Sequence, residues 1–286
     1  MIIDLSGKRV IVTGASRGIG QGIASAFARE GARLAICARN APALEAAADE
    51  YRKLGAADVI ATALNVKDTA QVRAFVDDVA ERWDGVDVLV NNAGQGQSGN
   101  IDTLDPEALL EHANGLQVAH FRFAQAVTPH MRKQKWGRII NINALAGAMT
   151  PPDGIPSVSN RAAGIAMSKS LGQALAKDNI LVNSLNMGWI DTGQWERHYR
   201  EMSPTISREE FFAMATSVVP LGRFGKPEDV AGIALFLASD YAGFVSAASI
   251  DVAGGMQGQI AYYPTLKREL MNEGLRREAA AKTKTA

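Results

Sequence analysis

The residues best suited to chemistry lie in a glycine-rich segment near the start of the chain, Thr13-Gly14-Ala15-Ser16-Arg17-Gly18-Ile19-Gly20. The segment follows an apolar run and precedes one with helical periodicity, over residues 21–29. Its glycines let the backbone turn tightly and approach a pyrophosphate without Cβ clashes. Free N–H groups and the positive dipole end of the following helix favour an anion at the same place. This strand, loop and helix arrangement predicts a dinucleotide-binding turn.

Strand-like and helical segments alternate along the rest of the chain. Apolar runs predict strands over 10–13, 34–38, 59–64, 86–90, 138–142, 180–185 and 249–252. Helical patterns predict helices over 21–29, 42–54, 68–83, 106–135, 157–178 and 227–238, with Pro129 kinking or ending a turn of the fourth. Buried strands separated by helices are typical of a parallel sheet covered on both faces. We therefore expect an α/β fold, a Rossmann-like doubly wound parallel sheet of about seven strands, with ligands at the carboxyl ends of the strands.

The domain organisation follows from the absence of a Ser/Pro/Gly-rich linker. We expect one nucleotide-binding Rossmann domain over residues 1–258, with an insertion around 193–219 that covers the site. The C-terminal tail, 259–286, is interpreted either as a helix that docks on a partner subunit or as a solvated end. Aromatic and sulfur side chains in and beside the insertion suggest an apolar ligand, or packing of the insertion itself: Trp189, Trp195, Tyr199, Phe211, Phe212 and Met214.

The chain resembles the short-chain dehydrogenase/reductase family over residues 5–258. The resemblance rests on the glycine spacing Thr-Gly-x-x-x-Gly-x-Gly and on Asn91-Asn92-Ala93-Gly94 after the fourth expected strand. Further matching segments are Ile180-Leu181-Val182-Asn183, Pro220-Leu221-Gly222-Arg223, Pro227-Glu228-Asp229-Val230-Ala231 and Asp251-Val252-Ala253-Gly254-Gly255. The resemblance implies a nicotinamide cofactor. It implies cofactor contacts from Gly14, Ser16, Arg17, Gly18, Ile19, Gly20, Arg39, Asn65, Val66, Asn92, Ala93, Gly94, Arg161, Gly188, Ile190 and Thr192.

The charge pattern at the glycine loop bears on the choice of cofactor. An acidic residue after the second strand would bind ribose hydroxyls and repel a 2′-phosphate. This chain has Ala38-Arg39 there, with Arg17 in the loop. Two guanidiniums near one point favour a phosphate dianion, so we predict NADP(H) over NAD(H). Asn65 stands where the family has an Asp that faces the adenine, and its amide oxygen can still accept a hydrogen bond.

The resemblance also locates the acid–base residues of family members that reduce carbonyls, which are Tyr, Lys, Ser and Asn. Alignment from the flanking motifs places Ser157 at the Tyr position, Arg161 at the Lys position, Ala144 at the Ser position and Leu116 at the Asn position. Serine is a much weaker acid than a phenol, and an arginine does not relay protons. We therefore expect the usual family route to be impaired, since acid–base catalysis contributes about 10²–10⁴-fold.

Neighbouring residues are candidates for a substitute site. Asn143 beside Ala144 can bind an oxyanion, and Ser157 with Arg161 can bind an anionic substrate group because residues four apart share a helix face. The alternative interpretations are structural: Asn143 caps a turn, and Ser157 caps its helix after Pro156. His112, His120 and His130 fall on the long fourth helix, where surface or interface positions are the default expectation. No metal site is predicted, because no His, Cys and carboxylate cluster has suitable spacing.

These features leave three functional hypotheses open. The first is an NADP-binding oxidoreductase of the short-chain dehydrogenase/reductase type with altered acid–base residues. The second is a catalytically inactive subunit, a pseudoenzyme that supports an active partner. The third is a non-redox enzyme that uses the same cleft with Ser157 as nucleophile, although the sequence shows no base near it. By resemblance we expect a homodimer or homotetramer paired through the two long helices, or a hetero-oligomer with an active relative.

Composition bounds the remaining possibilities. The 286 residues carry 30 basic and 30 acidic side chains, a balance that argues against nucleic acid as a main partner. The longest apolar run, 230–238, is too short to span a membrane. A strand pattern begins almost at once, which argues against a signal peptide. Cys37 is the single cysteine, so an intrachain disulfide is excluded, and a cytoplasmic location is expected.

Overall fold

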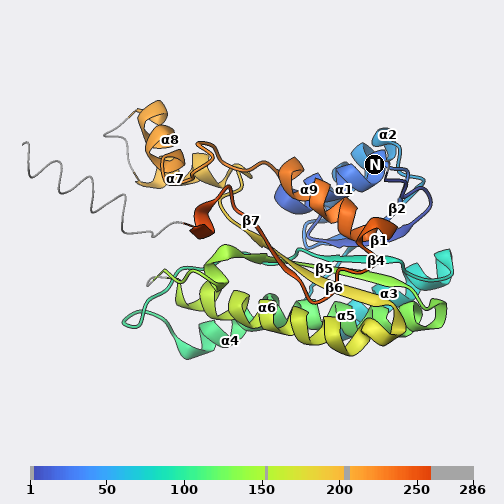
Figure 1. Ribbon diagram of the computed structural model, residues 1–286. Coiled ribbons are helices and arrows are strands. Elements are labelled where there is room, and N and C mark those ends of the chain that lie inside the picture. The colour runs from blue at the N-terminus through green and yellow to red at the C-terminus, as the bar shows by residue number, and fades with distance from the viewer. Residues whose placement is uncertain (1–2, 152–153, 203–206, 259–286) are drawn as a thin grey trace, which may run out of the picture.

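The computed structural model describes residues 3–151, 154–202 and 207–258, and these form a seven-stranded parallel sheet. The strand order is β3-β2-β1-β4-β5-β6-β7, so the chain winds outward from β1 in one direction and then from β4 in the other (Figure 1). The strands are β1 Arg9–Thr13, β2 Arg33–Ala38, β3 Asp58–Ala63, β4 Val88–Asn91, β5 Gly137–Ala144, β6 Ile180–Met187 and β7 Ser249–Val252. The expected doubly wound α/β fold is confirmed.

Helices cover both faces of the sheet. One face carries α1 (Gly18–Arg29), α2 (Ala41–Leu54) and α9 (Pro227–Ala238), whose apolar residues share a buried cluster with β1, β2 and β6. The other face carries α3 (Thr69–Trp83), α5 (Gln117–Gln134) and α6 (Ile155–Leu175), which share a second cluster with β4 and β5. Figure 1 shows the two helical layers on opposite sides of the strands. Because strands are buried on both faces, their apolar residues do not alternate with polar ones.

Local sequence signals explain where several helices begin. The Asn40 side chain accepts from the backbone N–H of Ala43 at the start of α2, and Asp68 caps α3 in the same way. Asp105 caps α4 (Pro106–Gly115), with Pro106 at its first position. Such caps satisfy N–H groups that have no partner inside the helix. They place the loops between strands and helices at one edge of the sheet.

The helix predicted over 106–135 is divided, contrary to our expectation. It breaks at Leu116, whose backbone (φ −121°, ψ −83°) leaves the helical region, and Pro129 lies inside the continuous helix α5. Arg122 stabilises the break, because Nη1 donates to the Asn114 carbonyl and Nη2 to the Asn114 side chain, at 3.1 and 2.6 Å. Leu116 itself is buried against Gly94. The break therefore depends on contacts between distant segments that periodicity does not record.

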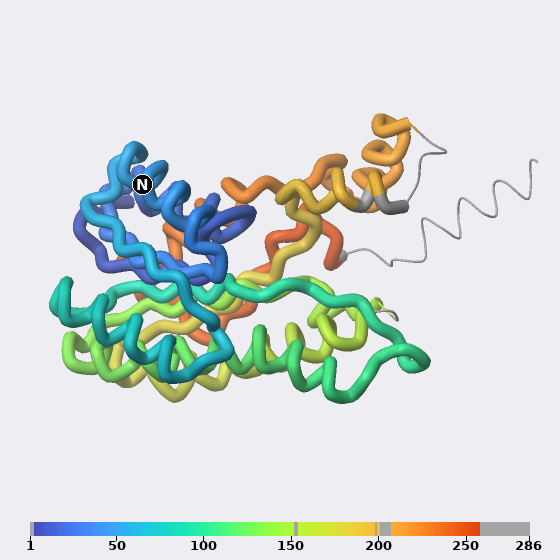
Figure 2. Tube along the Cα trace, turned by 180° about the vertical axis from the view of Figure 1, so that it is seen from behind, coloured from blue at the N-terminus to red at the C-terminus, as the bar shows by residue number. Residues whose placement is uncertain are grey.

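The insertion around 193–219 contains two short helices, α7 (Gln194–Met202) and α8 (Arg208–Thr216). In Figure 1 these helices extend beyond the end of β7, and Figure 2 shows from behind that they lie beyond the sheet on the side of α1 and α9. α4 and the segment that follows β4 lie toward the same end on the opposite side. The carboxyl ends of the central strands thus lie between two irregular segments. The tail, 259–286, is outside the described residues.

Candidate functional site

The glycine-rich loop adopts the conformation that its glycines permit. Gly14 and Gly18 have φ values of +67° and +62°, in the left-handed region that disfavours other residues. A Cβ atom on Gly20 would lie 2.4 Å from the Gly14 carbonyl oxygen, so only glycine fits where α1 starts against the loop. The first N–H groups of α1 have no partner within the helix, and the dipole there is positive. The loop has the form of a phosphate cradle.

Hydrogen bonds from the neighbouring strand hold this loop in shape. The Asn92 side chain donates to the carbonyl oxygens of Thr13 and Gly14, at 3.0 and 3.2 Å. The Thr13 hydroxyl oxygen accepts from the backbone N–H groups of Asn92 and Ala93, both at 2.9 Å. On the other side, the buried Tyr51 hydroxyl donates to the Ala15 carbonyl. The loop is therefore rigid before any ligand binds.

Two cationic side chains lie near the loop. Arg17 and Arg39 are exposed, and neither forms a hydrogen bond or ion pair with the residues that the structure describes. Strand pairing of Thr13 with Cys37 puts the loop beside the segment that carries Arg39. Asn65 follows β3 and is exposed, and its side-chain oxygen accepts from the Lys67 backbone, so part of its acceptor capacity is used.

The segment after β6 approaches the loop from the opposite side. A Cβ atom on Gly18 would meet the Thr192 side chain at 3.3 Å, so these two positions are adjacent. Ile190 is buried and pairs with Gly225. Gly188 lies so close to Ala253 that a Cβ atom there would be 2.7 Å from its Cα. Of the predicted cofactor residues in this segment, Thr192 therefore borders the glycine loop, whereas Ile190 and Gly188 pack against Gly225 and Ala253.

The expected chemical residues lie at the carboxyl end of β5 and on α6. Ala144 ends β5, and Ser157 and Arg161 are one helical turn apart on α6. Ser157 is half-buried, lies near Gly96, and its hydroxyl makes no hydrogen bond to any described residue. Arg161 is 8% exposed, and its Nη1 donates to the Ile142 carbonyl at 2.7 Å. Ser157 has no base as a hydrogen-bond partner within the described part of the chain.

Both structural alternatives for these side chains are wrong. Gly154 precedes α6, and no side chain caps it, so Ser157 lies inside the first turn rather than at the cap. Asn143 lies within β5 instead of capping a turn, and its amide donates to the buried Ser184 hydroxyl at 2.9 Å. That hydroxyl donates in turn to Asn186. One amide hydrogen of Asn143 is therefore committed to the sheet interior.

Two histidines lie deeper than the surface or interface positions expected for them. His120 on α5 is buried, and neither ring nitrogen makes a hydrogen bond of ordinary geometry to a described residue, although the Ala93 backbone is close enough to influence its pKa. Burial and the charge of Arg161 lower the pKa of His120 to about 3, so the ring is neutral. His112 on α4 is half-buried, with ring nitrogens 2.9 Å from the Gln95 carbonyl oxygen and 3.0 Å from the Asn160 amide. Burial also lowers the pKa of His112. Helical spacing gave no sign of this, because the break at Leu116 sets the position of α4.

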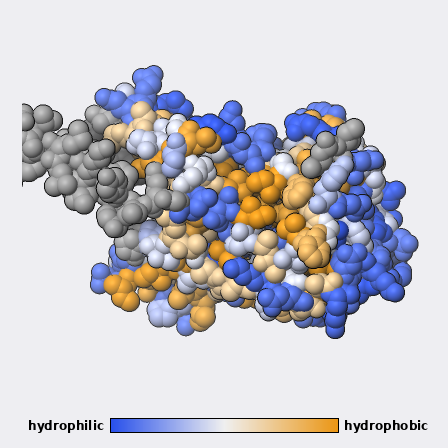
Figure 3. Space-filling model, in the orientation of Figure 1, coloured by the Kyte–Doolittle hydropathy of each residue, from blue (hydrophilic) through white to orange (hydrophobic). Residues whose placement is uncertain are grey.

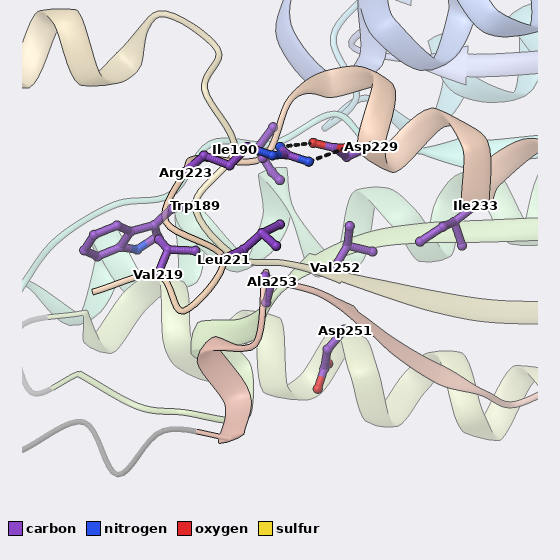
Figure 4. A pocket seen from close by; sticks show the side chains of 12 residues that line it. Trp189, Ile190, Val219, Leu221, Arg223, Asp229, Ile233, Asp251, Val252 and Ala253 are labelled. Atoms are coloured by element: carbon purple, nitrogen blue, oxygen red, sulfur yellow. Dashed lines mark hydrogen bonds and ion pairs between the residues drawn. The ribbon is translucent and has the colours of Figure 1, made fainter. Parts of the chain in front are cut away.

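Aromatic residues of the insertion pack on one another. Trp195 stacks on Phe224 with ring centres 4.6 Å apart, and Trp189 lies 4.7 Å from Trp195. Tyr199 and Phe212 contact Phe211. Beside this cluster, a cavity of about 250 Å³ lies between the end of β7 and α9, with the Arg223–Asp229 ion pair in its wall (Figure 4). The cavity borders the segment after β6 on the side away from β1.

The described residues contain neither a membrane-spanning helix nor a metal-binding cluster. No helix in that part of the chain is both long and apolar enough to cross a membrane. No group of three or more His, Cys, Asp or Glu residues is placed there to hold a metal ion.

Comparison with known proteins establishes the family. A family model described as enoyl-(acyl carrier protein) reductase matches residues 14–257. The chain is 35% identical over 253 residues to a 3-oxoacyl-(acyl-carrier-protein) reductase of Thermotoga maritima, covering 88% of this chain and 98% of the relative. This chain belongs to the short-chain dehydrogenase/reductase family. Members of that family are oxidoreductases, which is the class that the glycine loop and the sheet indicate.

Solved structures agree with this short-chain dehydrogenase/reductase fold. L-sorbose reductase of Gluconobacter frateurii, solved with NADPH and L-sorbose, matches with a TM-score of 0.86 and 31% identity. The match covers 91% of this chain and 100% of that chain. An NAD⁺-bound xylitol dehydrogenase matches with a TM-score of 0.81 and 28% identity, over 88% of this chain and 99% of that one. Relatives with this fold thus bind either nicotinamide dinucleotide.

Proposed function

We propose that this short-chain dehydrogenase/reductase binds NADP(H) in preference to NAD(H) and is an oxidoreductase with an altered acid–base set. The proposal assigns nucleotide binding to residues 1–258, with 193–219 as the covering segment. The observation that carries the cofactor preference is the pair of exposed guanidiniums, Arg17 and Arg39, beside the glycine loop with no carboxylate partner among the described residues. Guanidiniums bind phosphate dianions through paired, charge-assisted hydrogen bonds.

The residues present fit a dinucleotide. At Gly14 and Gly20 a Cβ atom would lie within 3.0 Å of neighbouring protein atoms, so the tight turn needs glycine there, and hydrogen bonds of Asn92 and Thr13 hold the turn in place. Thr192 borders the loop at Gly18. When bound, the nicotinamide supplies or accepts a hydride. At Arg161, Nη1 already donates to the Ile142 carbonyl, so this guanidinium is not assigned to the ribose hydroxyls that the family resemblance implies.

The acid–base chemistry of this chain differs from that of a phenol-bearing relative. Ser157 offers a free hydroxyl that can donate a hydrogen bond to a substrate oxygen, but an alcohol gives up its proton far less readily than a phenol. Ala144 offers no hydrogen-bonding side chain. We therefore expect the carbonyl oxygen to be protonated slowly, with water as the source. Turnover is expected to be about 10²–10⁴-fold below that of relatives with an intact set.

Calorimetric titration with NADPH and NADH tests the cofactor assignment. NADPH should bind about tenfold or more tightly than NADH, because the 2′-phosphate gains charge-assisted hydrogen bonds. Arg39→Ala and Arg17→Ala should each reduce this preference while leaving NADH affinity unchanged. Arg73→Ala, an exposed arginine on α3, serves as the control. Equal affinities for the two cofactors in the unmodified protein would refute the preference.

Restoring the family's residues tests the acid–base assignment. The triple variant Ala144→Ser, Ser157→Tyr and Arg161→Lys should raise NADPH-dependent turnover of a carbonyl panel by about 10²–10⁴-fold if the scaffold is competent. The single variant Ser157→Ala is the matched control and should not raise it. A triple variant that binds NADPH but shows no turnover of any carbonyl in the panel would contradict the oxidoreductase proposal.

A non-catalytic subunit is the second candidate, and exposed apolar side chains favour it. Phe244 is 104% exposed, and Leu221 and Tyr241 are also exposed near the end of β7 and after α9. Figure 3 shows apolar side chains gathered on the middle of this face. On the other layer, Val118 and Phe121 are exposed on α5, the helix expected to pair subunits. Native mass spectrometry distinguishes the two candidates, since a homodimer or homotetramer with turnover excludes an obligate supporting role.

A further inference from the structure

Arg161 differs from the half-buried Arg9 and the buried Arg138 in what surrounds its charge. Arg9 forms a two-point ion pair with Asp87, at 2.6 and 2.8 Å. Arg138 is stacked on the Trp136 ring and is attracted by the charge of Asp240. Arg161 has no carboxylate within ion-pair distance among the described residues, and burial alone lowers its pKa, to about 10. It therefore remains charged at neutral pH. A buried charge without a counterion is costly, so its position calls for an anionic partner.

The donors of Arg161 show where such a partner can bind. Nη1 is used by the Ile142 carbonyl, and Nε is buried with no partner among the described residues. Nη2 makes no hydrogen bond within the described chain, and unlike Nε it is not fully buried. Nη2 is thus the corner of the guanidinium that a ligand can reach. The Ser157 hydroxyl lies one turn earlier on the same helix and is also without a partner in the described chain.

The surroundings of this corner favour an anion over a cation or a second basic group. The titratable groups that interact electrostatically with Arg161 are His112 and His120, on α4 and α5. Both have lowered pKa values and are neutral at pH 7, so neither competes for an anion nor supplies a negative charge. The pyrophosphate of a dinucleotide is expected at the start of α1, beyond β1 and β4 from the end of β5. The pyrophosphate is therefore not expected to be the counterion of Arg161.

We propose that the substrate of this site carries a carboxylate, which binds Arg161 through Nη2 and accepts a hydrogen bond from Ser157. This proposal rests on the proposed function and names its substrate class, an oxo acid or the corresponding hydroxy acid. The carboxylate supplies a counterion that the described residues do not provide. A guanidinium and a hydroxyl on one helix face form a site for a carboxylate oxygen pair. An uncharged ketone of the same shape leaves the buried cation unpaired.

Calorimetry of the full chain saturated with NADPH tests this assignment. The probes are acetoacetate, 4-oxopentanoate and 2-oxohexanoate, which differ in the spacing of ketone and carboxylate, each beside its methyl ester. At least one acid should bind about tenfold or more tightly than its ester. Arg161→Met should abolish this difference, Arg161→Lys should retain part of it, and Ser157→Ala should weaken acid binding by a smaller factor. Arg73→Met, an exposed arginine remote from α6, should leave the difference intact.

Each outcome separates the two proposals. An ester that binds as well as its acid, a complete absence of acid binding, or an acid preference that survives Arg161→Met overturns the carboxylate assignment, while NADPH binding still supports the proposed function. If NADPH does not bind, the proposed function fails, and the same acid and ester titrations without NADPH judge the Arg161 site alone. Thermal melting of each variant verifies folding, and Arg161→Lys keeps the test decisive where Arg161→Met does not fold.

Discussion

The two halves of the carboxyl edge of the sheet are built in different ways. Around the glycine loop, side chains of Thr13, Asn92 and Tyr51 hydrogen-bond to backbone groups of the loop or of residues beside it, and the nearby cations are exposed. Between β5, α5 and α6, Arg161 Nε and both nitrogens of His120 are buried without partners in the described chain. The first half is complete without a ligand. In the second half, no described carboxylate pairs with Arg161, and we interpret the unpartnered buried groups there as the mark of a ligand site.

The sharpest test of this contrast compares the half-buried Arg9 with the buried Arg161. Arg9→Met should lower the free energy of unfolding by about 3 kcal/mol, because it leaves Asp87 buried without its cation. Arg161→Met should leave stability unchanged or raise it, since it removes a buried charge that pairs with no described carboxylate. Urea denaturation of both variants without ligand measures the difference. A similar loss in both would show that Arg161 is an ordinary structural residue.

The second prediction concerns pH and His120. The unfolded chain binds a proton at this residue below about pH 6.5, whereas the folded protein does so only near pH 3. Stability should therefore fall as the pH drops from 6.5 toward 3, by about 2 kcal/mol at pH 5. His120→Leu should flatten this dependence in urea denaturation at pH 5 and 7.5.

The control is His130→Gln, which replaces a partly exposed histidine on the same helix, 3.2 Å from Asp77. The loss of stability between pH 7.5 and pH 5 should persist in this variant. If the free energy of unfolding of His120→Leu depends on pH as strongly as that of the unmodified protein, other groups cause the acid sensitivity.

The third prediction concerns the glycine loop. Gly20→Ala introduces a Cβ atom 2.4 Å from the Gly14 carbonyl oxygen, so it should destabilise the protein by about 1–2 kcal/mol and weaken NADPH binding about tenfold. Gly232→Ala on α9 has nothing within 4 Å of its Cβ and should be neutral or slightly stabilising. Thermal melting and calorimetry measure both. Equal melting temperatures and equal NADPH affinities in the two variants would show that the glycine loop can shift to accommodate a Cβ atom at position 20.

Sequence reasoning succeeded where a local pattern has one structural solution. The last helix and last strand, α9 (Pro227–Ala238) and β7 (Ser249–Val252), have the predicted limits because a proline and a pair of glycines bound them. It failed at Leu116, where the break is stabilised by Arg122 and by packing on Gly94, and at Asn143, whose partner Ser184 is 41 residues away. Contacts between distant segments leave no trace in periodicity.

The sequence by itself determined the family, the parallel sheet and the glycine-rich turn, because glycine spacing and buried apolar runs act through local backbone geometry and burial. Only the tertiary structure decided that Arg161 lies buried near neutral His120, with no carboxylate partner among the described residues. The burial and charge environment of a side chain depend on elements that are far apart in the chain.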